Sequence, residues 1–208
     1  MKKLIIAILV VFVLVGACAF LMNSNEESNT VETQNTVNNE NETPNETTAL
    51  EINSAEDLSA VVDKLYEGKQ DLYPSLMTQP VDVTDKDTVS YMTGLENGDD
   101  LEYLVVSEPM MSSQAYSLIL AKVKDGADAD QVAKTMNENI DYRKWICVAA
   151  EKIYSTSSGN LVCLVMSSEE MAKPIYDEFK SLVGNVGQEY ERVGEEAELP
   201  VDDNMMEE

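Results

Sequence analysis

The residues best suited to chemistry in this chain of 208 residues are three cysteines, Cys18, Cys147 and Cys163, and the sequence contains no histidine. Without histidine there is no imidazole to serve as a general base, a metal ligand or a proton switch near neutral pH. Three cysteines alone cannot complete an ordinary four-ligand zinc site of cysteine and histidine. We therefore predict no catalytic residue, no cofactor and no metal site, and we expect that the protein is not an enzyme.

Carboxylates are the remaining groups that could support catalysis. A hydrolase of the glycosidase type needs two facing acids about 5–9.5 Å apart in a cleft. Residues 52–184 contain 23 Asp and Glu, and none of them stands out by its sequence context. The acidic stretches 96–100 and 125–130 are better explained as turns, because the second lacks the glycine and the ligand spacing of a calcium loop. A carboxylate-only hydrolase therefore stays an alternative interpretation.

Cys147 and Cys163 are the pair that could be redox-active or structural. We expect Cys147 on the inward stripe of a helix, and Cys163 in the middle of a strand that a helix covers. This placement is compatible with a disulfide, which persists outside the cytoplasm, and with two separate small core residues. The local sequence provides no basic cluster to activate the thiol of Cys163.

Two short segments are candidates for an interaction surface. The segment 142–145 (Tyr-Arg-Lys-Trp) concentrates positive charge and aromatic surface in an acidic region, and Arg143 could bind a carboxylate through its planar fork. Met110 and Met111 lie at the predicted tip of a hairpin, where exposed methionines would form an adaptable contact surface. We name Met110, Met111, Arg143 and Trp145 as this surface. In the alternative interpretation, the two basic residues face solvent on a helix and the methionines pack beneath a loop.

The N-terminus has the pattern of an export segment. Two lysines precede 19 residues without a charge, a stretch about 28 Å long as a helix and close to the thickness of a hydrocarbon core. Basic residues before an apolar run keep that end in the cytoplasm, so the remainder faces outward. Val15-Gly16-Ala17-Cys18 resembles a bacterial lipobox, which predicts lipidation at Cys18. Because residues 20–22 continue the apolar run, an uncleaved anchor is the second interpretation of residues 1–22.

The formal net charge of −25 is spread unevenly. Residues 23–51 carry seven Glu and no basic residue, and their Asn, Thr, Glu and Ser predict a disordered tether. Residues 52–184 carry 11 Lys and Arg against 23 acids (11 − 23 = −12) and have the composition of one globular domain. Residues 185–208, with one Arg and nine acids, are predicted to be a disordered acidic tail. The negative charge opposes binding to nucleic acid.

The spacing of apolar residues predicts helices and strands in a regular order. Ser54 suits the N-cap of a helix from about 55 to 67, and a short helix within 86–93 should end at Gly94. Two units of two strands and a helix follow, at 101–108, 114–124 and from 128, and then at 151–156, 160–167 and 168–183. The predicted fold is α+β, a two-layer sandwich in which helices cover one face of a four-stranded antiparallel sheet in ββα-ββα order.

The stretch from Leu101 to Val183 resembles a known group of proteins. The segments EYLVVSEPMMSSQAYSLILAKVKDGADADQV and SGNLVCLVMSSEEMAKPIYDEF are similar to the strand-turn-strand-helix segment and the closing hairpin and helix of one family. These are small, uncharacterised lipoproteins of Gram-positive bacteria (Firmicutes) with a C-terminal domain of unknown function. The resemblance implies an α+β domain tethered outside the cell through Cys18, and it implies no particular activity.

These features together predict a domain at the cell membrane that faces outward. We expect it to bind a protein, a peptide or an envelope component without catalysis. A sensory or solute-binding accessory of a transporter is the alternative, although the domain is small for the two lobes that close around a solute. The sequence does not identify the partner.

Overall fold

The computed structural model describes residues 50–111 and 113–194. The predicted export segment at 1–22, the lipidation of Cys18, almost all of the predicted tether and the tail from residue 195 lie outside the described residues.

The described part of the chain is α+β, with four helices and an antiparallel sheet of six strands. The elements run along the chain as α2 (Ala55–Tyr66), β1 (Leu76–Pro80), α3 (Lys86–Thr93), β2 (Leu101–Pro109), β3 (Ser117–Val123), α4 (Ala129–Asn139), β4 (Lys152–Ser158), β5 (Leu161–Ser167), α5 (Glu169–Val183) and β6 (Tyr190–Val193).

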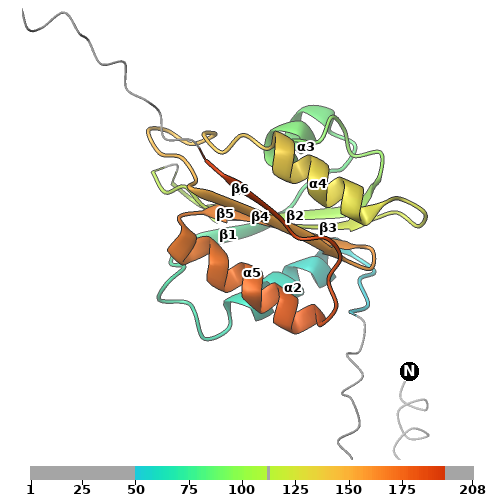
Figure 1. Cartoon of the computed structure of the whole chain (residues 1–208), viewed down its shortest axis with the longest axis horizontal. Coiled ribbons are helices and arrows are strands. Elements are labelled where there is room, and N and C mark those ends of the chain that lie inside the picture. Colours follow the sequence, from blue (N-terminus) through green and yellow to red (C-terminus); the bar gives the residue numbers. More distant parts are fainter. Residues whose placement is uncertain (1–49, 112, 195–208) are drawn as a thin grey trace, which may run out of the picture. The chain divides into compact units, whose positions relative to one another are not determined.

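The sheet differs from the predicted one in its number of strands and in its coverage. Its strand order is β1-β2-β3-β5-β4-β6, so the prediction of four strands is wrong. Helices α2 and α5 lie on one side of the sheet, and α3 and α4 lie on the other (Figure 1). The prediction that helices cover only one face is therefore also wrong. We call the two sides the α2–α5 face and the α3–α4 face.

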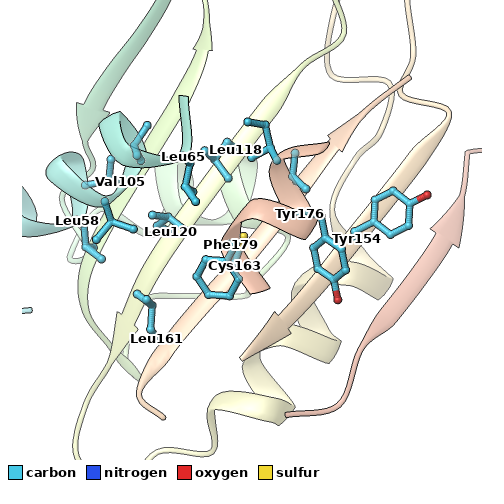
Figure 2. Packing of buried hydrophobic residues seen from close by; sticks show 14 of the residues in the cluster. Leu58, Leu65, Val105, Leu118, Leu120, Tyr154, Leu161, Cys163, Tyr176 and Phe179 are labelled. Atoms are coloured by element: carbon cyan, nitrogen blue, oxygen red, sulfur yellow. The ribbon is translucent and has the colours of Figure 1, made fainter. Parts of the chain in front are cut away.

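Both faces of the central strands are buried. Successive side chains of a strand point to opposite faces, and all seven residues of β5 are buried. On the α2–α5 face, Leu58 and Phe179 belong to the same buried cluster as Cys163 of β5 (Figure 2). On the α3–α4 face, a second cluster contains Ile119 of β3 and Met136 of α4. Burying both faces of one sheet in this way requires the three layers that the structure has.

The helix boundaries follow the capping residues that the sequence supplies. The Ser54 hydroxyl accepts a hydrogen bond from the Asp57 amide at 3.1 Å and starts α2. Asp128 caps α4 in the same way through the Gln131 amide. Gly94, with φ of +76°, ends α3 in the left-handed conformation that glycine adopts most readily. The predicted starts of α2 and α4 and the predicted end of α3 are confirmed to within a residue, whereas α4 ends at Asn139 and not beyond Cys147 as predicted.

The segment predicted as the start of a disordered tail forms the edge strand β6, antiparallel to β4. The prediction of disorder for 185–208 is therefore wrong at Tyr190–Val193. The strand is held from the α3–α4 face, because the Asn137 amide donates to the Tyr190 carbonyl at 3.3 Å and the Arg192 guanidinium donates to the Ile140 carbonyl at 2.6 Å. Four residues with only two inward side chains give too little apolar pattern to reveal a strand.

Candidate functional site

Large apolar side chains are exposed at one end of the β2–β3 hairpin. Met110 and Met111, directly after β2, are 72% and 73% exposed. Ile146, in the loop between α4 and β4, is 70% exposed, and Tyr91 of α3 is 54% exposed. We call these four residues the Met110–Ile146 surface. Exposed apolar side chains that gather in one patch are typical of contact surfaces.

A buried ion pair joins the elements that carry this surface. The Lys144 ammonium lies 2.5 Å from Glu108 Oε1, and the two side chains are 1% and 21% exposed. The ammonium also donates to the Ser117 hydroxyl at 3.5 Å. Burial lowers the pKa of Lys144, and the Glu108 carboxylate opposes this shift. The pair therefore attaches the loop that follows α4 to strands β2 and β3.

Two aromatic rings enclose the ammonium of Lys144. Its nitrogen lies 5.6 Å from the ring centre of Tyr91 and 5.5 Å from that of Trp145, within the range of cation–π contacts. The Tyr91 hydroxyl donates to the Lys144 carbonyl at 3.2 Å. Trp145 is half-buried and packs against the cluster on the α3–α4 face. These contacts fix the backbone at Lys144 and Trp145, directly before Ile146.

The predicted site residues divide into two groups in the structure. Met110 and Met111 are exposed near the end of a hairpin, and Trp145 lies at the base of the same surface. Arg143 is exposed, and its guanidinium lies 5.2 Å from the ring centre of Tyr142. Arg143 is thus placed beside the buried pair rather than in it.

The burial of Lys144 and its pairing with Glu108 were not predicted from the sequence. The segment 142–145 lies in a loop, since α4 ends at Asn139, so the alternative that placed Arg143 and Lys144 on a helix is wrong, and of the two only Arg143 faces solvent. Glu108, the partner of Lys144, is 36 residues earlier and looks like an ordinary solvent-facing residue near the end of a strand. Tyr91 and Ile146 were also missed, because no local pattern tells an exposed apolar residue from a buried one.

Cys147 and Cys163 are both free, and their environments differ. Cys163 is buried on the α2–α5 face, where burial raises the pKa of its thiol. Cys147 is exposed in the loop after α4, not on a helix stripe as predicted. Its neighbours Tyr142 and Trp145 pack against the cluster on the other side of the sheet. The structure therefore contains no disulfide between them, and the alternative of two core residues fits Cys163 only.

A pocket of about 530 Å³ lies between α2 and β1. Tyr66 and Tyr73 line it, with ring centres 5.3 Å apart, and the hydroxyl of each is hydrogen-bonded within the protein. The Tyr66 hydroxyl lies 2.9 Å from that of Tyr116, and the Tyr73 hydroxyl donates to the Met171 carbonyl at 2.6 Å. The other lining residues are Asp63, Gln70, Pro74, Ser75, Leu76 and Thr78.

Two features are absent from residues 50–111 and 113–194. Among these residues no helix has the length and apolar character needed to cross a membrane. In the same ranges, no three Cys, Asp or Glu side chains come together as a set of metal ligands.

Comparison of the chain with protein-family models, with curated proteins and with solved structures found no match. The resemblance to Gram-positive lipoproteins thus stays a prediction from the sequence.

Proposed function

We propose that this protein is a non-enzymatic binding module, held at the outer side of the cell membrane, which contacts a protein or peptide of the envelope through the Met110–Ile146 surface. The observation that carries the proposal is the exposure of Met110, Met111 and Ile146 by 70% or more around one buried ion pair. Exposing these side chains to water is unfavourable, and a partner that covers them would remove that cost.

The base of the surface suits binding because it is fixed before a partner arrives. Lys144 is held by Glu108, by Ser117 and by two aromatic rings. A preorganised backbone lowers the entropy lost on association. The methionine side chains above it are flexible and polarisable, so they adapt to the shape of an apolar partner. Rigid support beneath adaptable side chains favours contact with a protein or peptide.

The membrane location in this proposal depends on the sequence. The lipobox at Val15–Cys18 and the polar residues 23–51 would place the domain outside the membrane on a tether. A flexible chain of that length spans about 30 Å on average, which is enough for the domain to reach partners near the membrane surface.

The test is capture of a partner from the bacterial envelope by the full chain. We expect the wild-type chain to retain a discrete protein, and the double variant Met110→Asp/Ile146→Asp to retain at least tenfold less, because two charges replace the apolar contact. Ala60→Asp is the control, since Ala60 is exposed on α2, which lies on the opposite face of the sheet from α3 and from the loop after α4. Equal capture by the double variant and the wild-type chain would overturn the proposal.

A further inference from the structure

The outer edge of β1 is open to another strand. β1 is the first strand of the sheet and pairs only with β2 among the described residues. The Val81 amide donates to the Leu104 carbonyl at 2.9 Å, and the Met110 amide donates to the Ser75 carbonyl at 3.4 Å. Both bonds belong to the register in which Met77 faces Glu108.

This register fixes which backbone groups of β1 point outward. In an antiparallel pair, residues bonded to the neighbouring strand alternate with residues whose N–H and C=O point away from it. Ser75 and Val81 are bonded to β2, so the intervening even-numbered residues Leu76 and Thr78 direct their N–H and C=O to the open side. Pro80 has the same phase, which is where a proline in an edge strand is tolerated.

The pocket between α2 and β1 lies beside this open edge. Leu76 and Thr78 line it together with Tyr66 and Tyr73. Alternate side chains of a strand added at the edge would point toward the α2–α5 face. One of them would therefore enter the pocket, whose volume of about 530 Å³ exceeds that of any single side chain.

The chemistry of the pocket favours a basic side chain. Tyr66 and Tyr73 supply aromatic surface, and Asp63 is a lining residue. The Thr78 hydroxyl donates to Ser107 at 3.1 Å, which leaves its lone pairs as acceptors. Residues 50–194 carry 12 Lys and Arg against 26 Asp and Glu, a net charge of −14 (12 − 26). This field attracts a cationic segment.

We propose that β1 binds an extended basic peptide of a partner protein as an additional antiparallel or parallel strand, with one Lys or Arg side chain in the pocket formed by Asp63, Tyr66, Tyr73 and Thr78. The inference shares with the proposed function only the premise that the chain is a binding module. The peptide would bind at β1, not at the Met110–Ile146 surface.

Other occupants are disfavoured by composition. The chain's own segments 23–51 and 195–208 contain no Lys or Arg, so they offer no basic side chain to the pocket. A second copy that paired through β1 would present Leu-Met-Thr-Gln-Pro, which also contains no basic residue. The partner peptide is therefore expected to belong to another protein.

The experiment uses the full chain in detergent micelles and a displayed library of random heptapeptides, followed by synthetic copies of the enriched sequence. We expect enriched peptides to carry Lys or Arg, with a preference that recurs at every second position. Thr78→Pro should weaken binding about tenfold or more, because it removes an outward N–H while leaving the bonds to β2 intact. Thr78→Val, which keeps that N–H, is the matched control and should weaken binding much less.

Two further measurements do not depend on folding of the proline variant. N-methylation of the peptide backbone should abolish binding only at alternate positions, and Asp63→Asn should weaken binding and reduce its salt dependence. Binding that tolerates N-methylation throughout, or that is unchanged in Thr78→Pro, would overturn the inference. So would a dimer that Thr78→Pro converts to a monomer, because a second copy would then occupy β1.

The outcome for this inference is separate from that of the proposed function. Peptide binding that persists in Met110→Asp/Ile146→Asp and is lost in Thr78→Pro supports the β1 site. Binding lost in the double variant and retained in Thr78→Pro overturns the β1 site and supports the Met110–Ile146 surface.

Discussion

At the scale of single residues, the Lys144–Glu108 pair connects sequence positions that no local pattern relates. The ammonium is almost completely buried, whereas the carboxylate side chain is 21% exposed. Removing a partner from a buried pair leaves an uncompensated charge, and the cost depends on how much water the remaining charge can recover. The two single substitutions should therefore have unequal effects.

Substitution of each member of the pair tests this asymmetry. Glu108→Gln leaves the ammonium of Lys144 buried without its counter-charge and should lower the free energy of unfolding by about 3 kcal/mol. Lys144→Met leaves a partly solvated carboxylate and should lower it by a smaller amount, about 1–2 kcal/mol. Urea unfolding of both variants and of the double variant Lys144→Met/Glu108→Gln gives the coupling energy. Additive effects of the two changes would contradict the pairing described here.

The same pair marks a limit of prediction at this scale. The sequence singled out the segment 142–145 and the exposed Met110 and Met111, but it left the burial of Lys144 undetected. A lysine and a glutamate 36 positions apart become partners only because the loop after α4 crosses the ends of β2 and β3. That crossing is a feature of the tertiary structure, and the loop residues that make it show no periodic pattern of apolar side chains.

At the scale of secondary-structure elements, the contact between α3 and the end of α4 supports Tyr91 beside Lys144. Gly94 ends α3 at φ of +76°, and a Cβ built there would lie 2.4 Å from the Ile140 backbone nitrogen. The close approach is possible only because residue 94 has no side chain. Two separate constraints thus favour glycine at position 94: the positive φ of its backbone and the close approach of the Ile140 backbone.

Two alanine substitutions distinguish the cost of the positive φ from the cost of the steric overlap. Gly126 has φ of +88° and no atom within 4 Å of a built Cβ, so Gly126→Ala measures the conformational cost alone, about 1–2 kcal/mol. Gly94→Ala adds overlap with backbone atoms and should lower the free energy of unfolding by about 1–3 kcal/mol more. Thermal or urea unfolding of the two variants checks this difference. Equal losses of stability would show that α3 does not pack against the end of α4 as described.

The elements themselves could largely be predicted, and their arrangement in layers could not. Capping residues and glycines set the helix ends correctly at Ser54, Asp128 and Gly94. The continuous apolar runs at 118–121 and 161–166 did carry a sign of burial on both faces, because a strand with one solvated face alternates apolar and polar residues. The one-face prediction overlooked that sign.

At the scale of the whole molecule, buried tyrosines make the stability sensitive to alkaline pH. Burial raises the pKa of Tyr73 to about 12 and that of Tyr66 and Tyr116 above the ordinary value near 10. The folded state therefore keeps these protons at a pH where the unfolded chain releases them. Their contribution to stability is complete below pH about 10 and is lost as the pH rises toward 12 and beyond.

The change Tyr73→Phe tests this linkage. The variant removes one proton that the folded state retains, so its free energy of unfolding should fall less steeply between pH 10 and 12, by up to about 1.4 kcal/mol per pH unit. The comparison of slopes is independent of any constant loss from the missing hydrogen bond to Met171. Parallel pH curves for the variant and the wild-type chain would contradict burial of the Tyr73 hydroxyl.

The central claim is that the molecule contacts a partner through one defined surface, and site-specific photocrosslinking on intact cells tests it most directly. A photoreactive residue at position 146 should yield one discrete crosslinked product, which Met110→Asp should abolish. The same residue at position 60, exposed on α2 at the opposite face of the sheet, should yield none. No product from position 146, or the same product from positions 146 and 60, would contradict the account.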